Sequence, residues 1–330
     1  MSSTPLHRDA IVVDGLQISR WGRDIFEEQH AAGITAVNCT CSVWEGFVET
    51  MDNIARWKGW FREHGDLLRP VKTVEDVHAA KAEGRVGVVL GFQNLGAIET
   101  DLRRLELFKE LGVGVMQLAY NTQNLVGAGC YESVDRGLTD FGHEVVAEMN
   151  RLGILVDLSH VGSNTSRDAI LASTRPVAYS HTCPAVTNPH PRNKTDEEIR
   201  FIAERGGFVG VTLLPWFLRA DGKATLADYV DAIEHVVSVA GEDSVGVGTD
   251  YMQGYGMAFI EWLRRDKGYA RLVSPLPKAE GDAFAMPAGL DRIVDWPNIT
   301  AEMERRGWAE GRIRKLIGGN WLRLLGSVWS

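Results

Sequence analysis

Two short apolar segments of this chain each end in a Ser-His pair. Ile154–Ser159 is followed by His160, and Pro176–Ser180 is followed by His181. Runs rich in Val, Ile and Leu are typical of strands buried on both faces, and in a parallel barrel the residues after the strands share the rim where catalytic groups gather. Because imidazole is the commonest metal ligand, the repeated pair predicts a metal site at that rim. The alternative, that hydrogen bonds inside the barrel satisfy one or both rings, stays open.

The elements that must position these histidines alternate regularly between strands and helices. Such alternation indicates a parallel sheet, and eight strands favour a closed (β/α)8 barrel over an open sheet. A doubly wound sheet would need a glycine-rich phosphate loop after the first strand, and Asp14–Ile18 is no such loop. The predicted strands are 10–13, 34–38, 86–91, 115–119, the two segments that end in Ser-His, 208–212 and 245–248.

Composition limits the class of protein. The chain has 330 residues, of which 45% are hydrophobic and 24% charged, and this suits one barrel domain over residues 1–330 with a C-terminal helical extension. A net charge of −9 argues against a nucleic-acid partner. There is no apolar stretch of about 18 residues and no basic start before an apolar run. We therefore expect a cytoplasmic protein with no membrane partner.

Other side chains fall near the predicted rim. Cys41 and Cys183 could add thiolate ligands, although cysteine is more often simply buried. A long glycine-rich loop, Asn121–Thr139, follows the fourth strand, and loops of that length are usually functional. Aromatic residues at the rim could cage an amine cation or pack loops onto the barrel. They are Trp44, Tyr120, Tyr131, Trp216 and Tyr251.

Five motifs resemble those of the membrane dipeptidase family, peptidase family M19, and they occur in one order over most of the chain. They are Asp157–His160, Ser180-His181, His190-Pro191-Arg192-Asn193, Gly248-Thr249-Asp250 and Gly318–Arg323. The resemblance implies an amidohydrolase-type (β/α)8 barrel, a homodimer, two zinc ions and hydrolysis of dipeptides. It also assigns roles: His160 and His181 bind metal, Asp250 binds metal and takes a proton from water, and Arg192 binds the substrate carboxylate.

The chain departs from this family where the first metal is held. The family's His-x-Asp pair falls on Leu16 and Ile18, its bridging glutamate falls on Gln93, and a substrate-facing histidine falls on Tyr120, before Asn121. Two dications about 3.5–4 Å apart repel strongly and need a bridging anion, whereas glutamine offers only a neutral carbonyl oxygen.

A single divalent metal is therefore predicted. His160 and His181 would hold it, with Asp250 or Gln93 as a further ligand. Zinc is the first expectation, with iron and manganese as alternatives. An empty site in a retained barrel is the remaining interpretation.

Three functions fit these residues. The first is a metal-dependent hydrolase of dipeptidase type, with Asp250 as base, Tyr120 as a catalytic or substrate-contacting group, and Arg192 with Asn121 binding a carboxylate substrate. The second is a different reaction on a small N-substituted amino acid, with Tyr120 as acid. The third is a non-catalytic protein that binds a small carboxylate.

Overall fold

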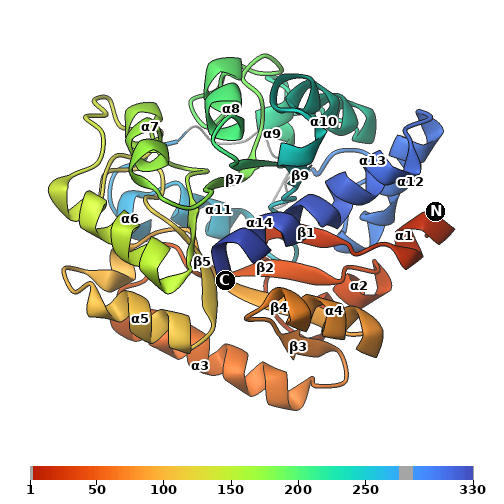
Figure 1. Cartoon of the computed structure of the whole chain (residues 1–330), viewed down its shortest axis with the longest axis horizontal. Coiled ribbons are helices and arrows are strands. Elements are labelled where there is room, and N and C mark those ends of the chain that lie inside the picture. Colours follow the sequence, from red (N-terminus) through yellow and green to blue (C-terminus); the bar gives the residue numbers. More distant parts are fainter. Residues whose placement is uncertain (1–2, 275–284, 330) are drawn as a thin grey trace.

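Parallel strands form a nearly closed barrel in the computed structural model, which describes residues 3–274 and 285–329 (Figure 1). The strand order is β1-β2-β4-β5-β6-β7-β8-β9, with the short β3 beside β4. Backbone hydrogen bonds from Ile18 to Tyr251 and from Asp250 to Leu16 join the two ends of the sheet. The predicted (β/α)8 barrel is therefore confirmed. The strands are β1 Val13–Gln17, β2 Ala36–Ser42, β3 Leu68–Pro70, β4 Val86–Phe92, β5 Val113–Gln117, β6 Leu155–Asp157, β7 Ala178–Thr182, β8 Phe208–Val211 and β9 Val245–Val247.

The apolar residues predict the first strand at 10–13, which is too early, because β1 runs Val13–Gln17. Its polar residues are buried because they bond to one another and to Thr249, which follows the last strand. The Asp14 carboxylate accepts hydrogen bonds from the Gln17 side chain at 2.8 Å and from the backbone and hydroxyl of Thr249 at 2.8 and 2.6 Å. A local apolar pattern carries no signal for a partner 235 residues away.

Helices surround the barrel in Figure 1, and several begin at a threonine whose side chain accepts a hydrogen bond from the first turn. In the described residues, none of the helices combines the length and the hydropathy needed to span a bilayer. The α-helices are α1 Pro5–Asp9, α2 Arg23–Ala31, α3 Phe47–Glu63, α4 Val74–Glu83, α5 Arg103–Glu110, α6 Asp140–Leu152, α7 Ser163–Ala172, α8 Asp196–Ala203, α9 Pro215–Leu218, α10 Leu226–Ala240, α11 Met257–Leu263, α12 Pro297–Arg305, α13 Glu310–Arg314 and α14 Asn320–Trp329.

The N-terminal end of the barrel is filled by the C-terminal helix. Trp321 of α14 packs on Phe208 and donates from its indole nitrogen to the Val247 carbonyl at 2.8 Å. Above it, the backbone of Ser180 passes so close to Gly210 and Gly248 that a Cβ on either would lie 2.0 Å from the Ser180 oxygen. The plug and the glycines leave the opposite, C-terminal rim as the open end of the barrel, next to the two histidines.

Candidate active site

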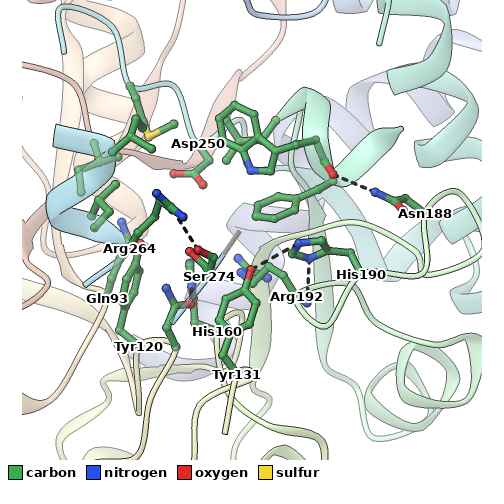
Figure 2. A pocket seen from close by; sticks show the side chains of 18 of the residues that line it. Gln93, Tyr120, Tyr131, His160, Asn188, His190, Arg192, Asp250, Arg264 and Ser274 are labelled. Atoms are coloured by element: carbon green, nitrogen blue, oxygen red, sulfur yellow. Dashed lines mark hydrogen bonds between the residues drawn. The ribbon is translucent and has the colours of Figure 1, made fainter. Parts of the chain in front are cut away.

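A cavity of about 290 Å³ opens at the C-terminal ends of the strands. Segments after seven strands line it, and Figure 2 shows their labelled side chains around one space. Its polar lining residues are Gln93, Tyr120, Asn121, Tyr131, His160, Asn188, His190, Arg192, Asp250, Arg264 and Ser274. The large apolar side chains that line it are Ile18, Leu214, Trp216, Phe217, Met252, Ile260 and Leu263. An apolar cavity with a few convergent polar groups is the usual form of a small-molecule site.

The two predicted histidines meet beside this cavity, and His160 lines it. His160 follows β6 and His181 lies in β7, and their Nε2 atoms are 3.0 Å apart. His160 Nδ1 contacts the Asn121 side-chain oxygen at 2.7 Å, and because an amide oxygen only accepts, Nδ1 carries the hydrogen. Burial and the nearby Arg192 lower the pKa of both imidazoles well below the ordinary value, so both rings are neutral.

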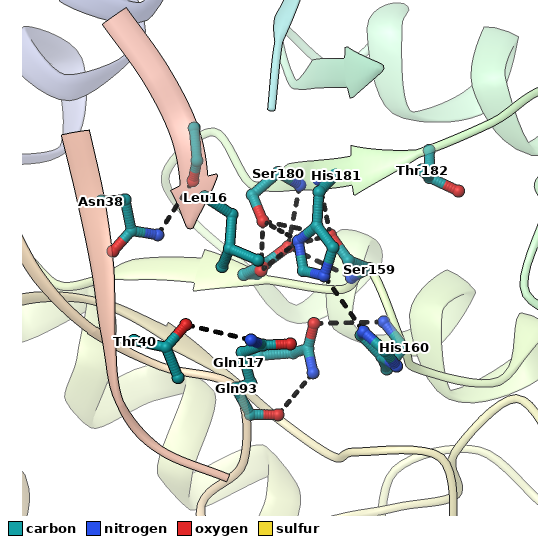
Figure 3. A network of polar contacts seen from close by, with 12 residues as sticks. Leu16, Asn38, Thr40, Gln93, Gln117, Ser159, His160, Ser180, His181 and Thr182 are labelled. Atoms are coloured by element: carbon teal, nitrogen blue, oxygen red, sulfur yellow. Dashed lines mark hydrogen bonds and ion pairs between the residues drawn. The ribbon is translucent and has the colours of Figure 1, made fainter. Parts of the chain in front are cut away.

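A buried hydrogen-bond network also fixes the His181 ring with its hydrogen on Nδ1 (Figure 3). The Asp157 carboxylate accepts hydrogen bonds from the hydroxyls of Ser159 at 2.7 Å and Ser180 at 2.5 Å. With its one hydrogen committed to Asp157, Ser180 Oγ accepts from His181 Nδ1 at 2.7 Å. His181 Nε2, like His160 Nε2, is therefore left with a free lone pair.

Two lone pairs that face each other at 3.0 Å suit a single cation. Leu16 and Ile18 are buried and bring no donor to the neighbouring position. In the described ranges, no group of three or more His, Cys, Asp and Glu side chains is close enough to hold a metal ion. Asp250 lines the same cavity, and its role as a ligand, like that of Gln93, stays a prediction.

Arg192 presents a buried positive charge to the cavity. It is fully buried; one guanidinium nitrogen donates to the His181 carbonyl at 2.5 Å and another to Thr182 Oγ1 at 3.4 Å. Its Nε has no hydrogen-bond partner, and within the described part of the chain no carboxylate pairs with it. Because a buried charge with no ion-pair partner in contact is costly, this guanidinium suits an anionic ligand.

Asp250, which follows the last strand, brings a carboxylate to the same cavity as Arg192. It follows β9 in the left-handed backbone region, with φ 61°, and its backbone nitrogen donates to Leu16 O at 2.9 Å. Burial raises the pKa of its carboxyl to about 7, against the opposing effect of Arg192. The group is therefore poised near neutral pH, as a general base requires.

We expect Asp250→Asn to stabilise the protein at pH 8 and not at pH 4. The folded-state pKa is raised above the ordinary 3.8, so the stability that Asp250 contributes is full below about pH 4 and is lost as the pH rises through about 7. The neutral amide avoids this loss, and each kcal/mol should raise Tm by about 2–4 °C. Thermal unfolding at both pH values measures the difference, with exposed Asp52→Asn as the control. The same difference in Tm between Asp250→Asn and the wild type at both pH values would contradict a raised pKa for Asp250.

Three other predicted residues line the cavity. Tyr120 stacks on the His160 ring with centroids 4.1 Å apart, and burial raises the pKa of its phenol. Asn121, in the left-handed region with φ 61°, uses its side-chain oxygen to hold His160. Gln93 donates to Thr40 Oγ1 at 3.0 Å. Their predicted roles toward substrate remain predictions.

Some residues near the predicted rim do not line this cavity. The buried Tyr251 donates its hydroxyl to Leu290 O at 3.1 Å, and Trp44 lines a separate cavity of about 570 Å³ beside α3. Cys41 and Cys183 are buried, and burial raises the pKa of both thiols, which disfavours thiolate ligands.

Several lining residues have no individual role predicted from the sequence. Among the polar ones, His190 is only part of a motif, and Tyr131 is only one of the rim aromatics that could cage an amine cation or pack loops. The motif's polar character was the one local signal for His190, and the length of the loop 121–139 was the signal for Tyr131.

Comparisons with known proteins agree with this geometry. The family model for membrane dipeptidase (Peptidase family M19) matches residues 24–282 and 280–329. An uncharacterised dipeptidase of Schizosaccharomyces pombe is 29% identical over 284 residues, 84% of this chain and 61% of that protein. Dipeptidase aclJ of Aspergillus oryzae is 30% identical over 269 residues, 80% of this chain and 57% of that protein. The chain thus spans about three fifths of the length of these relatives.

A solved structure is similar over the whole chain. It is an amidohydrolase from Pseudomonas aeruginosa, 49% identical, with a TM-score of 0.96 over 100% of this chain and 99% of that one. The predicted amidohydrolase-type barrel is confirmed by this likeness.

Proposed function

Because the chain belongs to the membrane dipeptidase family, peptidase family M19, we propose that it is a metal-dependent hydrolase of a dipeptide-like or small N-substituted amino acid with a free carboxylate. The observation that carries the proposal is Arg192, a fully buried guanidinium that faces the cavity with an unpartnered Nε. A planar guanidinium binds a carboxylate through two parallel hydrogen bonds.

The remaining lining residues suit the other end of such a substrate. The walls formed by Leu214, Phe217 and Ile260 keep water away, which strengthens charge interactions inside. Asp250, with a carboxyl pKa of about 7, accepts a proton from the attacking water, and the Tyr120 hydroxyl donates a hydrogen bond where negative charge develops.

The family implies a divalent metal, and the residues fit one ion rather than two. His160 and His181 would hold it through their two Nε2 lone pairs. The chemistry that a metal supplies in such a site is polarisation of the scissile carbonyl. Leu16 and Ile18 offer no donor and Gln93 no charge, so a second ion has neither ligands nor an anionic bridge.

We expect at most one tightly bound divalent metal per chain. Zinc, manganese or iron is added, the excess is removed by dialysis, and elemental analysis gives the metal-to-protein ratio. His160→Ala and His181→Ala should each reduce that ratio to near zero, whereas His235→Ala, which removes an imidazole paired with Asp196 on the surface, should not. Two equivalents in the wild type, or full retention in both site variants, would contradict the assignment.

The function itself is tested with N-acyl and N-carbamoyl amino acids and their matched carboxamides. Hydrolysis of the carboxylates, stimulated by metal and lost in His160→Ala, is the expected result. Binding without turnover would support the alternative, a non-catalytic carboxylate-binding barrel, which the missing ligands at Leu16 and Ile18 favour. Absence of both binding and turnover would contradict the two functions together.

A further inference from the structure

Tyr131 and His190 form a contact at the mouth of the cavity that the proposed chemistry does not use. The Tyr131 hydroxyl lies 3.5 Å from His190 Nε2, and the two rings meet edge-on with centroids 5.9 Å apart. The two residues come from different loops, one after β5 and one after β7. Both line the cavity together with Arg192 (Figure 2).

The direction of the hydrogen bonds follows from the backbone. The Arg192 backbone N–H donates to His190 Nδ1 at 3.2 Å, so Nδ1 carries a lone pair and the ring hydrogen is on Nε2. Nε2–H therefore points its hydrogen at the Tyr131 oxygen. Burial and Arg192 lower the pKa of His190 to about 4, which agrees with a neutral ring.

With its oxygen accepting from His190, the Tyr131 hydroxyl keeps its own hydrogen for another acceptor. None of the described residues accepts it, and the side chain borders the space that Arg192 faces. Tyr131 is also close enough to Arg192 for the guanidinium charge to act on its phenol.

We propose that Tyr131 is a specificity-determining residue that donates its hydroxyl hydrogen to the same substrate carboxylate that Arg192 binds. This inference rests on the proposed function, because it requires a carboxylate ligand at Arg192. Arg192 supplies charge and Tyr131 a neutral donor, and His190 holds the tyrosine oxygen while its other nitrogen is tied to the Arg192 backbone. The loop 121–139 thereby takes part in substrate selection.

The test separates this role from simple packing. Tyr131→Phe keeps the ring contact with His190 and removes only the hydroxyl. Calorimetry with N-acetylglycine and its carboxamide, N-acetylglycinamide, measures both affinities in wild type, Tyr131→Phe and Arg192→Lys. For Tyr131→Phe we expect the affinity for the carboxylate to fall about tenfold, as for one lost hydrogen bond to a charged group, and the affinity for the carboxamide to stay within about twofold. Tyr269→Phe, at an exposed tyrosine, is the matched control.

The possible results distinguish a failure of this inference from a failure of the proposed function. A loss of carboxylate affinity in Arg192→Lys without one in Tyr131→Phe would overturn this inference and leave the proposed function standing. No loss in Arg192→Lys would overturn the proposed function. Equal losses for carboxylate and carboxamide in Tyr131→Phe would show that the hydroxyl only supports the loop, and would overturn the inference as well.

Discussion

Standard dipeptides such as L-Ala-D-Ala and Gly-D-Ala are expected to be hydrolysed at less than about 0.01 s⁻¹, roughly 10³-fold below the median turnover of enzymes on their own substrates. Peptide hydrolysis requires an activated water and stabilisation of a tetrahedral oxyanion at the same time. The resemblance to the family implies that two metals share that work there. The resemblance puts the family's first metal ligands at Leu16 and Ile18, which are buried and apolar, and its bridging carboxylate at Gln93, which is neutral.

The resemblance puts Tyr120 where the family has a substrate-facing histidine, and a phenol carries no positive charge near neutral pH. Loss of a single oxyanion donor costs about 10²–10³ in rate, and loss of a metal adds to it. The retained groups, His160, His181, Asp250 and Arg192, still allow reaction of a small carboxylate with a more labile bond.

The measurement is a dipeptide panel with added zinc, manganese or cobalt and direct detection of the released amino acids. His160→Ala is assayed in parallel, because any rate that it retains does not come from this site. Turnover of about 10 s⁻¹ in the wild type, absent from His160→Ala, would show that the missing ligands do not limit peptide hydrolysis.

Replacement of Arg192 by lysine is expected to weaken carboxylate binding by roughly 10- to 100-fold, which corresponds to one charge-assisted hydrogen bond of about 1.5–3 kcal/mol. Lysine keeps the charge but lacks the planar pair of donors, and its shorter hydrogen-bonding reach cannot also serve the His181 carbonyl and Thr182. The same change should leave the matched carboxamide almost unaffected.

Trp216 lines the cavity, so tryptophan fluorescence can follow the titration. Arg264→Lys is the matched control, because Arg264 lines the same cavity but its guanidinium is engaged by Ser274 O at 2.9 Å and Glu261 at 2.8 Å. Unchanged carboxylate affinity in Arg192→Lys would contradict the prediction that Arg192 binds the substrate carboxylate. An equal loss of affinity in Arg264→Lys would show that the effect is not specific to Arg192.

Much of the architecture and part of the site could be predicted from the sequence, because both depend on local patterns. Alternating apolar runs and capped helices follow from the chemistry of neighbouring residues, and they predict a parallel barrel. Strand ends in such a barrel share one rim, so the repeated Ser-His was enough to place His160 and His181 together. The absence of donors at Leu16 and Ile18 is likewise a property of the residues themselves.

Only the tertiary structure decided which buried polar groups have hydrogen-bond partners and which do not. Asp14 and Gln17 extend the first strand because Thr249, which follows the last strand, donates to Asp14, and Gln17 donates to the same carboxylate. Arg192 faces the cavity with a free Nε, and His190 orients Tyr131, because loops from different strands meet there. Burial and the partners of a charge depend on segments that are distant in sequence, and no local pattern encodes them. For that reason the sequence determined the barrel and its pair of histidines, and the folded chain determined how Arg192, Tyr131 and His190 meet at the proposed carboxylate site.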